Sequence, residues 1–212
     1  MLIRHKDLRG VTLVELLVGM SILGFLLALA MPSFASWMQN MQIRNAAESI
    51  QNGLQQARIE AVRRNTTVRF QLTTTVDNSC AISTGKANWV VNLGSQTTND
   101  PSGSCGAAIA ATVSQYVAAN APFILQKDSA SKSPNVAVAS NGTAANWLVV
   151  FGSMGQVVWP TAASTQWDLT NSAGGACASS SGPMTCMRIL VSSNGRIRMC
   201  NPNLASGTPQ GC

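Results

Sequence analysis

The side chains able to do chemistry are sparse in this sequence, and their pattern argues against an enzyme. His5 is the only histidine and lies ahead of a long apolar stretch, so the rest of the chain has no histidine to act as a general base or zinc ligand. Carboxylates stand singly, whereas paired-carboxylate catalysis and calcium binding both need clustered oxygens. Gly152-Ser153-Met154-Gly155 is not a nucleophile elbow. We therefore expect no catalytic residue, no metal and no cofactor.

The cysteines form a second informative set and indicate disulfide bonds. An even number of cysteines in an exported, loop-rich domain is typical of a disulfide framework. Several pairings are possible, and we favour the pairs that are neighbours in sequence, because each would close a loop rich in Gly, Ser and Asn. All six follow the apolar stretch, and none forms a Cys-x-x-Cys pair: Cys80, Cys105, Cys177, Cys186, Cys200 and Cys212.

Basic residues gather in a predicted hairpin near the C-terminal end of the chain. The alternating segments Met187–Ser192 and Arg196–Cys200 predict two strands. The residues between them allow either a two-residue Asn-Gly turn or a three-residue loop with Gly195 left-handed. The three-residue loop pairs Ser192 with Arg196 and collects four apolar side chains on one face, whose burial favours this register: Ile189, Val191, Ile197 and Met199.

The same register places Arg188, Arg196 and Arg198 together on the solvent side of the hairpin. Such a face is often only a solvated sheet edge, because charge protects edge strands from aggregation. Residues 188–212 contain no acidic side chain, however, so a phosphate group could approach without repulsion. The formal net charge of +6 is too small to indicate nucleic-acid binding by itself.

The apolar stretch Val11–Met31 predicts a helix that crosses a membrane. About 20 apolar residues in a helix span the hydrocarbon core of a bilayer. Arg4, Lys6 and Arg9 precede the stretch, and the next basic residue after it is Arg44. This bias predicts a cytoplasmic N-terminus and a body on the other side of the membrane.

Glu15 is the ionised residue inside this stretch, and it needs a reason because a carboxylate at mid-membrane costs about 2.5–3.5 kcal/mol. One explanation is a capping box, in which the Thr12 hydroxyl accepts from the N–H of Glu15 and the carboxylate accepts from the N–H of Thr12. The other is intermolecular. If the chain is cut after Gly10, the new amine of Val11 in a neighbouring copy could pair with Glu15 inside the lipid. The two explanations are compatible.

A short basic leader ending in Gly10, followed by Val11-Thr12-Leu13-Val14-Glu15 and an unbroken apolar helix, resembles the N-terminal region of type IV pilins and type II secretion pseudopilins. The resemblance implies that a prepilin peptidase cuts after Gly10 and methylates the amine of Val11. It also implies that Glu15 sets the register during assembly and that Pro32 is the helix-bending proline of the family. Val11 stands where most members have Phe.

Residues 33–65 should continue as an amphipathic helix that ends near Asn65, and Val68–Leu72 alternates as a first strand. The segment Ala57–Asn65 resembles the GspH/FimT branch of the pseudopilins, which includes minor pilins of the FimT and FimU type and the H pseudopilin of type II secretion. The apolar side chains of the helix recur at steps of three to five residues: Phe34, Met38, Met41, Ala46, Ile50, Leu54, Ala57 and Ala61.

The rest of the chain predicts short strands and loops. Residues 73–146 are rich in Ser, Thr, Asn, Ala and Gly, and we expect a polar insert over a sheet, with short strands at Trp89–Leu93 and around Ser114–Ala118. A hairpin should follow, with strands at Trp147–Phe151 and Gln156–Trp159.

Together these features imply an α+β pilin fold with a long N-terminal helix, membrane-spanning in its first half and packed by its second half on an antiparallel β-sheet with disulfide-closed loops. The expected parts are a leader at 1–10, a membrane and assembly helix at 11–32, an amphipathic helix half at 33–65, and a β-rich domain at 66–212.

The function that the resemblance implies is that of a minor pilin or pseudopilin, which assembles or primes a type IV pilus or a type II secretion pseudopilus near its tip. Its partners would be other major or minor pilins or pseudopilins, the prepilin peptidase and the inner membrane. The protein would cross that membrane once, with the N-terminus cytoplasmic and the domain periplasmic, before it enters the filament.

Two alternatives remain open from the sequence. Gly195-Arg196-Ile197-Arg198 resembles the G-R-x-R motif with which FimT-type minor pilins bind DNA during natural transformation, so double-stranded DNA is a possible partner, with Arg188 as a helper. Ala28-Leu29-Ala30 resembles an ordinary signal-peptidase site, and cleavage there would release a secreted domain that starts at Met31. The apolar run before that site is longer than a usual signal sequence.

Overall fold

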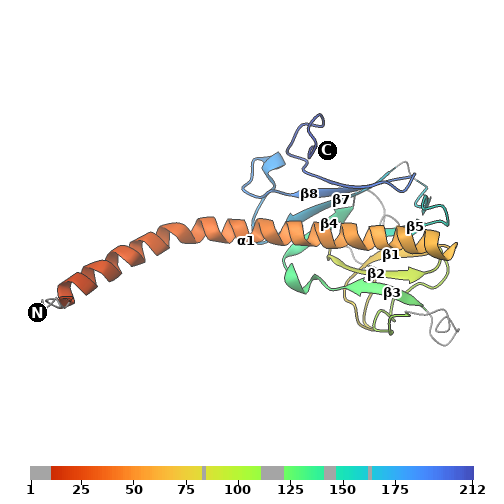
Figure 1. Cartoon of the computed structure of the whole chain (residues 1–212), viewed down its shortest axis with the longest axis horizontal. Helices are drawn as coiled ribbons and strands as arrows, with labels where there is room; N and C mark the ends of the chain where they lie inside the picture. The colour runs from red at the N-terminus through yellow and green to blue at the C-terminus, as the bar shows by residue number, and fades with distance from the viewer. Residues whose placement is uncertain (1–10, 83–84, 111–121, 141–146, 162–163) are drawn as a thin grey trace, which may run out of the picture. The chain divides into compact units, whose positions relative to one another are not determined.

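The computed structural model describes residues 11–82, 85–110, 122–140, 147–161 and 164–212 (Figure 1). The predicted cleavage residue Gly10 and the strand predicted around Ser114–Ala118 lie outside these ranges. The contacts within the chain form two compact units, one ending at Met38 and one from Gln39 to Cys212.

The first unit consists of the N-terminal part of helix α1, whose full extent is Leu13–Arg64. The backbone N–H of Glu15 donates to the Thr12 hydroxyl oxygen at 3.2 Å, which is the first of the two bonds expected of a capping box. An 18-residue window of α1 has a mean hydropathy of 2.4, and α1 is the one described helix long and apolar enough to cross a membrane. The helix is continuous past Pro32, and the kink expected there stays a prediction.

The second unit begins with the part of α1 that carries the domain core. Its buried stripe starts at Ile43 and continues at helical spacing through Ile50, Leu54 and Ala61. The sequence had placed Met41 on this face, but Met41 is 40% exposed. Met41 lies two positions before Ile43, which is a rotation of about 200° around the helix, so its side chain points away from the core. Two other side chains expected on the stripe lie in the first unit and are also exposed: Phe34 and Met38.

Glycine and asparagine set two features of this helix. A Cβ atom at Gly53 would lie 2.7 Å from the Phe70 ring and 3.0 Å from the Trp89 ring, so only glycine allows the helix to approach the sheet this closely. At the C-terminal end, Asn65 adopts a left-handed φ of 49° and the N–H of Thr66 donates to the Ala61 carbonyl at 3.2 Å. The helix therefore ends where the sequence predicted it.

Nine strands in the described part of the chain form two antiparallel sheets (Figure 1). The first sheet has the order β3-β2-β1-β5-β6. Its strands are β1 (Val68–Thr73), β2 (Asn88–Leu93), β3 (Ile124–Asp128), β5 (Leu148–Phe151) and β6 (Val157–Trp159).

The second sheet has the order β4-β7-β8-β9, and all of its neighbours are antiparallel. The two sheets share one core with α1, because the Phe70 ring on β1 lies 5.6 Å from the ring of Trp167 on β7 and 5.6 Å from that of Trp89. The strands are β4 (Val136–Ser140), β7 (Ser164–Asn171), β8 (Met187–Ser192) and β9 (Ile197–Cys200).

The α+β class is confirmed, with a long helix packed on antiparallel strands that divide between two sheets. The strand predicted at Trp89–Leu93 is confirmed as β2, but the prediction that residues 73–146 form an insert over a sheet is wrong, because this segment supplies β2 and β3 to the first sheet and β4 to the second. Its strands are integral to the fold, since Val136 and Val138 on β4 are buried in the common core.

Three disulfide bonds close loops around these sheets. Cys80 bonds Cys105, Cys177 bonds Cys186, and Cys200 bonds Cys212, which are the three pairs favoured from the sequence. Such bonds stabilise a fold by about 2–4 kcal/mol each, chiefly by restricting the unfolded chain. The third bond holds the last residues of the chain beside β9.

Candidate functional site

The hairpin of β8 and β9 has the predicted register. Ile189 pairs with Met199 and Val191 with Ile197, and the N–H of Ser192 donates to the Arg196 carbonyl at 2.9 Å. The four apolar side chains of these two pairs face the core. The turn is the three-residue loop, so Arg196 and Arg198 alternate with Ile197 and Met199, which are partly buried and pack against the core.

Gly195 holds this turn against a second turn from the other sheet. Its φ is 80°, and a Cβ atom built on it would lie 1.9 Å from the carbonyl oxygen of Gly155, in the turn between β5 and β6. The N–H of Val157 donates to the Ser193 carbonyl at 2.9 Å, which ties the two turns directly. The contact between the two turns was not predicted, because each turn was inferred from its own residues.

Arg188 was predicted to share the solvent side of the hairpin with Arg196 and Arg198, but it is ion-paired. It lies opposite Asp168 across β7 and β8, and its guanidinium makes a bidentate ion pair with that carboxylate, with Nη2 to Oδ2 at 3.1 Å. Residues 188–212 contain no acidic side chain, but the carboxylate comes from the neighbouring strand β7. Arg188 is therefore neutralised where it sits.

Arg196 and Arg198 remain available to an anion to different degrees. The Arg196 side chain is exposed, and its backbone N–H donates to the side-chain oxygen of Asn194 at 3.0 Å. Arg198 is half-buried, and its Nη2 donates to the Cys212 carbonyl oxygen at 3.4 Å. The Cys200–Cys212 disulfide brings that carbonyl into reach.

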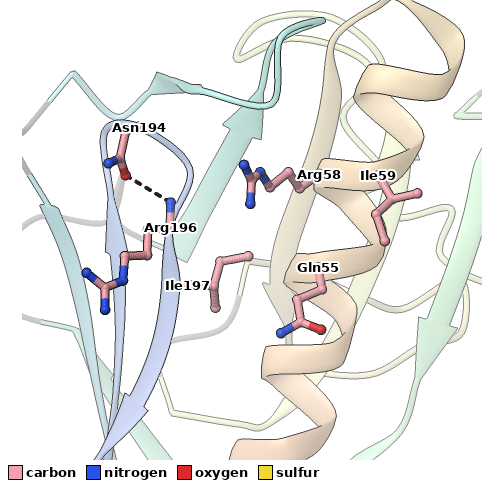
Figure 2. A pocket seen from close by; sticks show the side chains of 6 residues that line it. All are labelled: Gln55, Arg58, Ile59, Asn194, Arg196 and Ile197. Atoms are coloured by element: carbon pink, nitrogen blue, oxygen red, sulfur yellow. Dashed lines mark hydrogen bonds between the residues drawn. The ribbon is translucent and has the colours of Figure 1, made fainter.

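An open groove of about 530 Å³ separates the hairpin from α1 (Figure 2). Arg58 lies in this groove and was not singled out from the sequence. Its Nε donates to the Gly155 carbonyl oxygen at 3.2 Å. The lining residues are Gln55, Arg58 and Ile59 from α1 and Asn194, Arg196 and Ile197 from the hairpin.

In the described part of the domain, the ion-paired carboxylates bind arginines outside the groove, so they do not neutralise its positive charge. Among the described residues, every ion pair involves an arginine other than Arg58, Arg196 and Arg198: Arg44–Glu48, Arg63–Glu60, Arg64–Glu60, Arg69–Asp100 and Arg188–Asp168. None of the described residues that line the groove is acidic. The groove therefore presents uncompensated positive charge, which attracts anions.

Glu60 is the carboxylate next along α1 from the groove, and it is already satisfied. Burial alone would raise the pKa of Glu60, but hydrogen bonds and charges from Arg63 and Arg64 outweigh burial and lower it. Glu60 therefore stays ionised and paired with these two arginines. Within the described ranges, no three His, Cys, Asp or Glu side chains gather as a metal site would require.

In the first unit, two of the residues predicted to act in processing and assembly are exposed. Val11 is 72% exposed, and Glu15 lies exposed in the first turn of α1. Both are therefore open to a second chain. The apolar side chains that follow them are also exposed, from Leu13 at 80% to Met31 at 69%.

Two protein-family models match this chain, one over its N-terminal segment and one over its domain. The Prokaryotic N-terminal methylation motif matches residues 6–31. The pilin-like protein PilA1 of Thermus thermophilus is 42% identical over 66 residues, which cover 31% of this chain and 41% of that protein. This chain thus spans under half the length of that relative.

The fold is similar to that of the type IV minor pilin FimU of Pseudomonas aeruginosa PAO1, solved in two crystal forms. The first match has a TM-score of 0.49 at 18% identity and covers 83% of this chain and 98% of FimU. The second has a TM-score of 0.45 at 19% identity, with 80% and 98% covered. The model of the family Type II transport protein GspH matches residues 46–209, which is most of the chain. This protein therefore belongs to the GspH family.

Proposed function

We propose that this pilin-like subunit is a minor pilin or pseudopilin that acts in assembly or priming near the tip of its filament. One observation carries the proposal: α1 leaves its apolar side chains exposed from Leu13 to Met31. Surface of this kind needs lipid before assembly and other apolar helices afterwards. Cleavage after Gly10 and methylation of Val11 would prepare this helix for the filament.

Membrane topology follows from charge. The basic residues ahead of the helix favour a cytoplasmic N-terminus, so the domain would lie in the periplasm before assembly. The three disulfides are consistent with that oxidising compartment. Prepilin peptidase, the inner membrane and neighbouring pilins or pseudopilins are the partners of this scheme.

Glu15 gives the proposal its sharpest test. Its carboxylate would pair with the N-terminal amine of a neighbouring subunit, an interaction that is strong because lipid does not screen it. Glu15→Gln should leave the protein in the membrane fraction but remove it from sheared filaments. Glu48→Gln changes an exposed carboxylate of the domain half of α1 and should be present in both fractions.

Thr12→Ala separates the two roles considered for Glu15. It removes the observed cap, whose loss costs about 1 kcal/mol of helix stability, but keeps the carboxylate. We expect Thr12→Ala to assemble. Normal incorporation of Glu15→Gln would overturn the pairing mechanism. An equal defect in Thr12→Ala, which keeps the carboxylate, would show that assembly depends on the capped first turn of α1 and not on the charge of Glu15 alone.

We propose DNA binding as a second function, because the Arg196 side chain is exposed beside a groove that no carboxylate lines. Guanidinium groups contact backbone phosphates without reading the base sequence. The test is titration of the full-length protein in a neutral detergent with a labelled DNA duplex over a series of salt concentrations. Each phosphate neutralised contributes about −0.9 to the log–log slope, and Arg196→Gln should make the slope shallower.

A further inference from the structure

We infer that Arg58 on α1 is a second phosphate ligand of this surface, so that the binding site for double-stranded DNA spans the helix and the hairpin. The inference rests on the DNA-binding proposal and extends it to a residue far from the hairpin in sequence. Its ligand is the phosphate backbone of the duplex.

The Arg58 side chain lies on the same surface as Arg196. Arg58 and Arg196 line the same groove, one from α1 and one from the β8–β9 hairpin. Figure 2 shows the guanidinium of Arg58 reaching from the helix toward the hairpin turn, while that of Arg196 extends from the other side of the hairpin, away from the helix. Two cations placed on either side of one turn suit two different phosphates along a backbone better than one shared phosphate.

A hydrogen bond to the β5–β6 turn anchors the Arg58 side chain. An arginine side chain has five N–H donors, and the Gly155 carbonyl oxygen accepts from only the Nε–H, at 3.2 Å. The terminal amino groups stay available, and the side chain is already partly ordered. Because a fixed guanidinium loses less conformational entropy on binding, this anchor favours contact with an anion.

The other residues around Arg58 in the groove are uncharged or basic. The side-chain amides of Gln55 and Asn194 can donate to phosphate or sugar oxygens, as is usual in contacts to the DNA backbone. Ile59 and Ile197 supply apolar surface without competing charge. Glu60 is held by its own two arginines, so it does not neutralise Arg58.

A purely structural role for Arg58 makes a different prediction. If Arg58 served only to tie α1 to the β5–β6 turn, its replacement would lower stability without changing the number of phosphates neutralised. The two roles therefore separate in the salt dependence of binding, which counts phosphate contacts, when stability is measured alongside it.

The experiment compares four variants of the full-length protein in neutral detergent, by fluorescence anisotropy of a labelled duplex across a salt series. Arg58→Gln and Arg196→Gln should each make the log–log slope less negative by about 0.9, which corresponds to the loss of one phosphate contact. Arg63→Gln is the matched control, because it removes the same charge from an exposed side chain on the same helix, where Glu60 already pairs it. Arg58→Lys keeps the charge and should keep the slope while binding weakens, whatever Arg58→Gln does to stability.

Each outcome decides between claims. If the wild-type protein does not bind at low salt, DNA binding and this inference both fail. Suppose that the wild type binds and that Arg196→Gln makes the slope shallower, while Arg58→Gln behaves like Arg63→Gln. The inference about Arg58 then fails and the DNA-binding proposal stands. If polyglutamate competes as strongly as duplex DNA with the same order of variants, the surface recognises an acidic protein partner, and the assignment to DNA is overturned.

Discussion

Replacing Gly195 by alanine should destabilise the domain more than the left-handed backbone alone explains. Gly103 provides the matched comparison, because its φ is 77° against 80° for Gly195. A Cβ atom on Gly103 has nothing within 4 Å, whereas one on Gly195 lies 1.9 Å from the Gly155 carbonyl oxygen. The two substitutions therefore share the backbone cost and differ in the clash.

The structure gives the expected size of the difference. A left-handed conformation costs an L-residue about 1–2 kcal/mol, which applies to both positions. Relief of the clash at Gly195 requires the two turns to move apart, and overpacking of this kind costs about 1–3 kcal/mol. Moving them also strains the hydrogen bond from Val157 to Ser193, worth about 1 kcal/mol net. We expect Gly195→Ala to lose about 2–4 kcal/mol more than Gly103→Ala.

The assay is urea unfolding of the full-length protein in neutral detergent, followed by tryptophan fluorescence. Trp89 and Trp167 are buried in the core and report its loss. The free energy of unfolding is obtained by linear extrapolation at a common slope. Equal losses for Gly195→Ala and Gly103→Ala would refute the close packing of the two turns, and with it the geometry of the groove beside Arg58.

Two further predictions concern charge. The pKa of Glu60 is lowered in the folded protein, so its stabilising effect is present above its ordinary value of 4.5 and is lost as pH falls through the lower folded value; Glu60→Gln should therefore flatten the acid side of a urea-midpoint profile, and an unchanged profile would contradict the pairing with Arg63 and Arg64. Arg188→Ala should leave the salt slope of DNA binding unchanged, because Asp168 already neutralises this arginine, and a slope reduced by about 0.9 would show that the ion pair opens for a phosphate.

Local patterns carried most of what the sequence could predict. The β8–β9 register followed from alternation and from one glycine in the turn, because a shift by one residue would expose the apolar face. The helix end at Asn65 and the hairpin after Trp147 followed from equally local signals. These features depend on residues that are close in sequence, so a single chain is enough to infer them.

Strand β7 escaped prediction because half of its buried positions are polar. Trp167 and Leu169 face the core, but Thr165 and Asn171 alternate with them and are buried too. The Asn171 amide donates to the Gln42 side-chain oxygen at 3.1 Å, a partner supplied by α1. A buried polar residue with a distant partner looks like a loop residue in the sequence.

The candidate site was predictable only in part, for the same reason. The hairpin motif identified Arg196 and Arg198. Arg58 could not be identified in this way, because it lies beside the hairpin only where the β5–β6 turn packs against the β8–β9 turn. Asp168 removes Arg188 from the site across a strand pair that the sequence did not reveal. Pairwise charge balance in the folded domain is a tertiary property.

Mass spectrometry of the mature N-terminus, on protein recovered from sheared filaments, reports processing and assembly together. We expect a chain that begins at Val11 with one methyl group on its amine. A chain that begins at Met31 and appears in the medium, with none in the filament fraction, would contradict the assignment as a filament subunit.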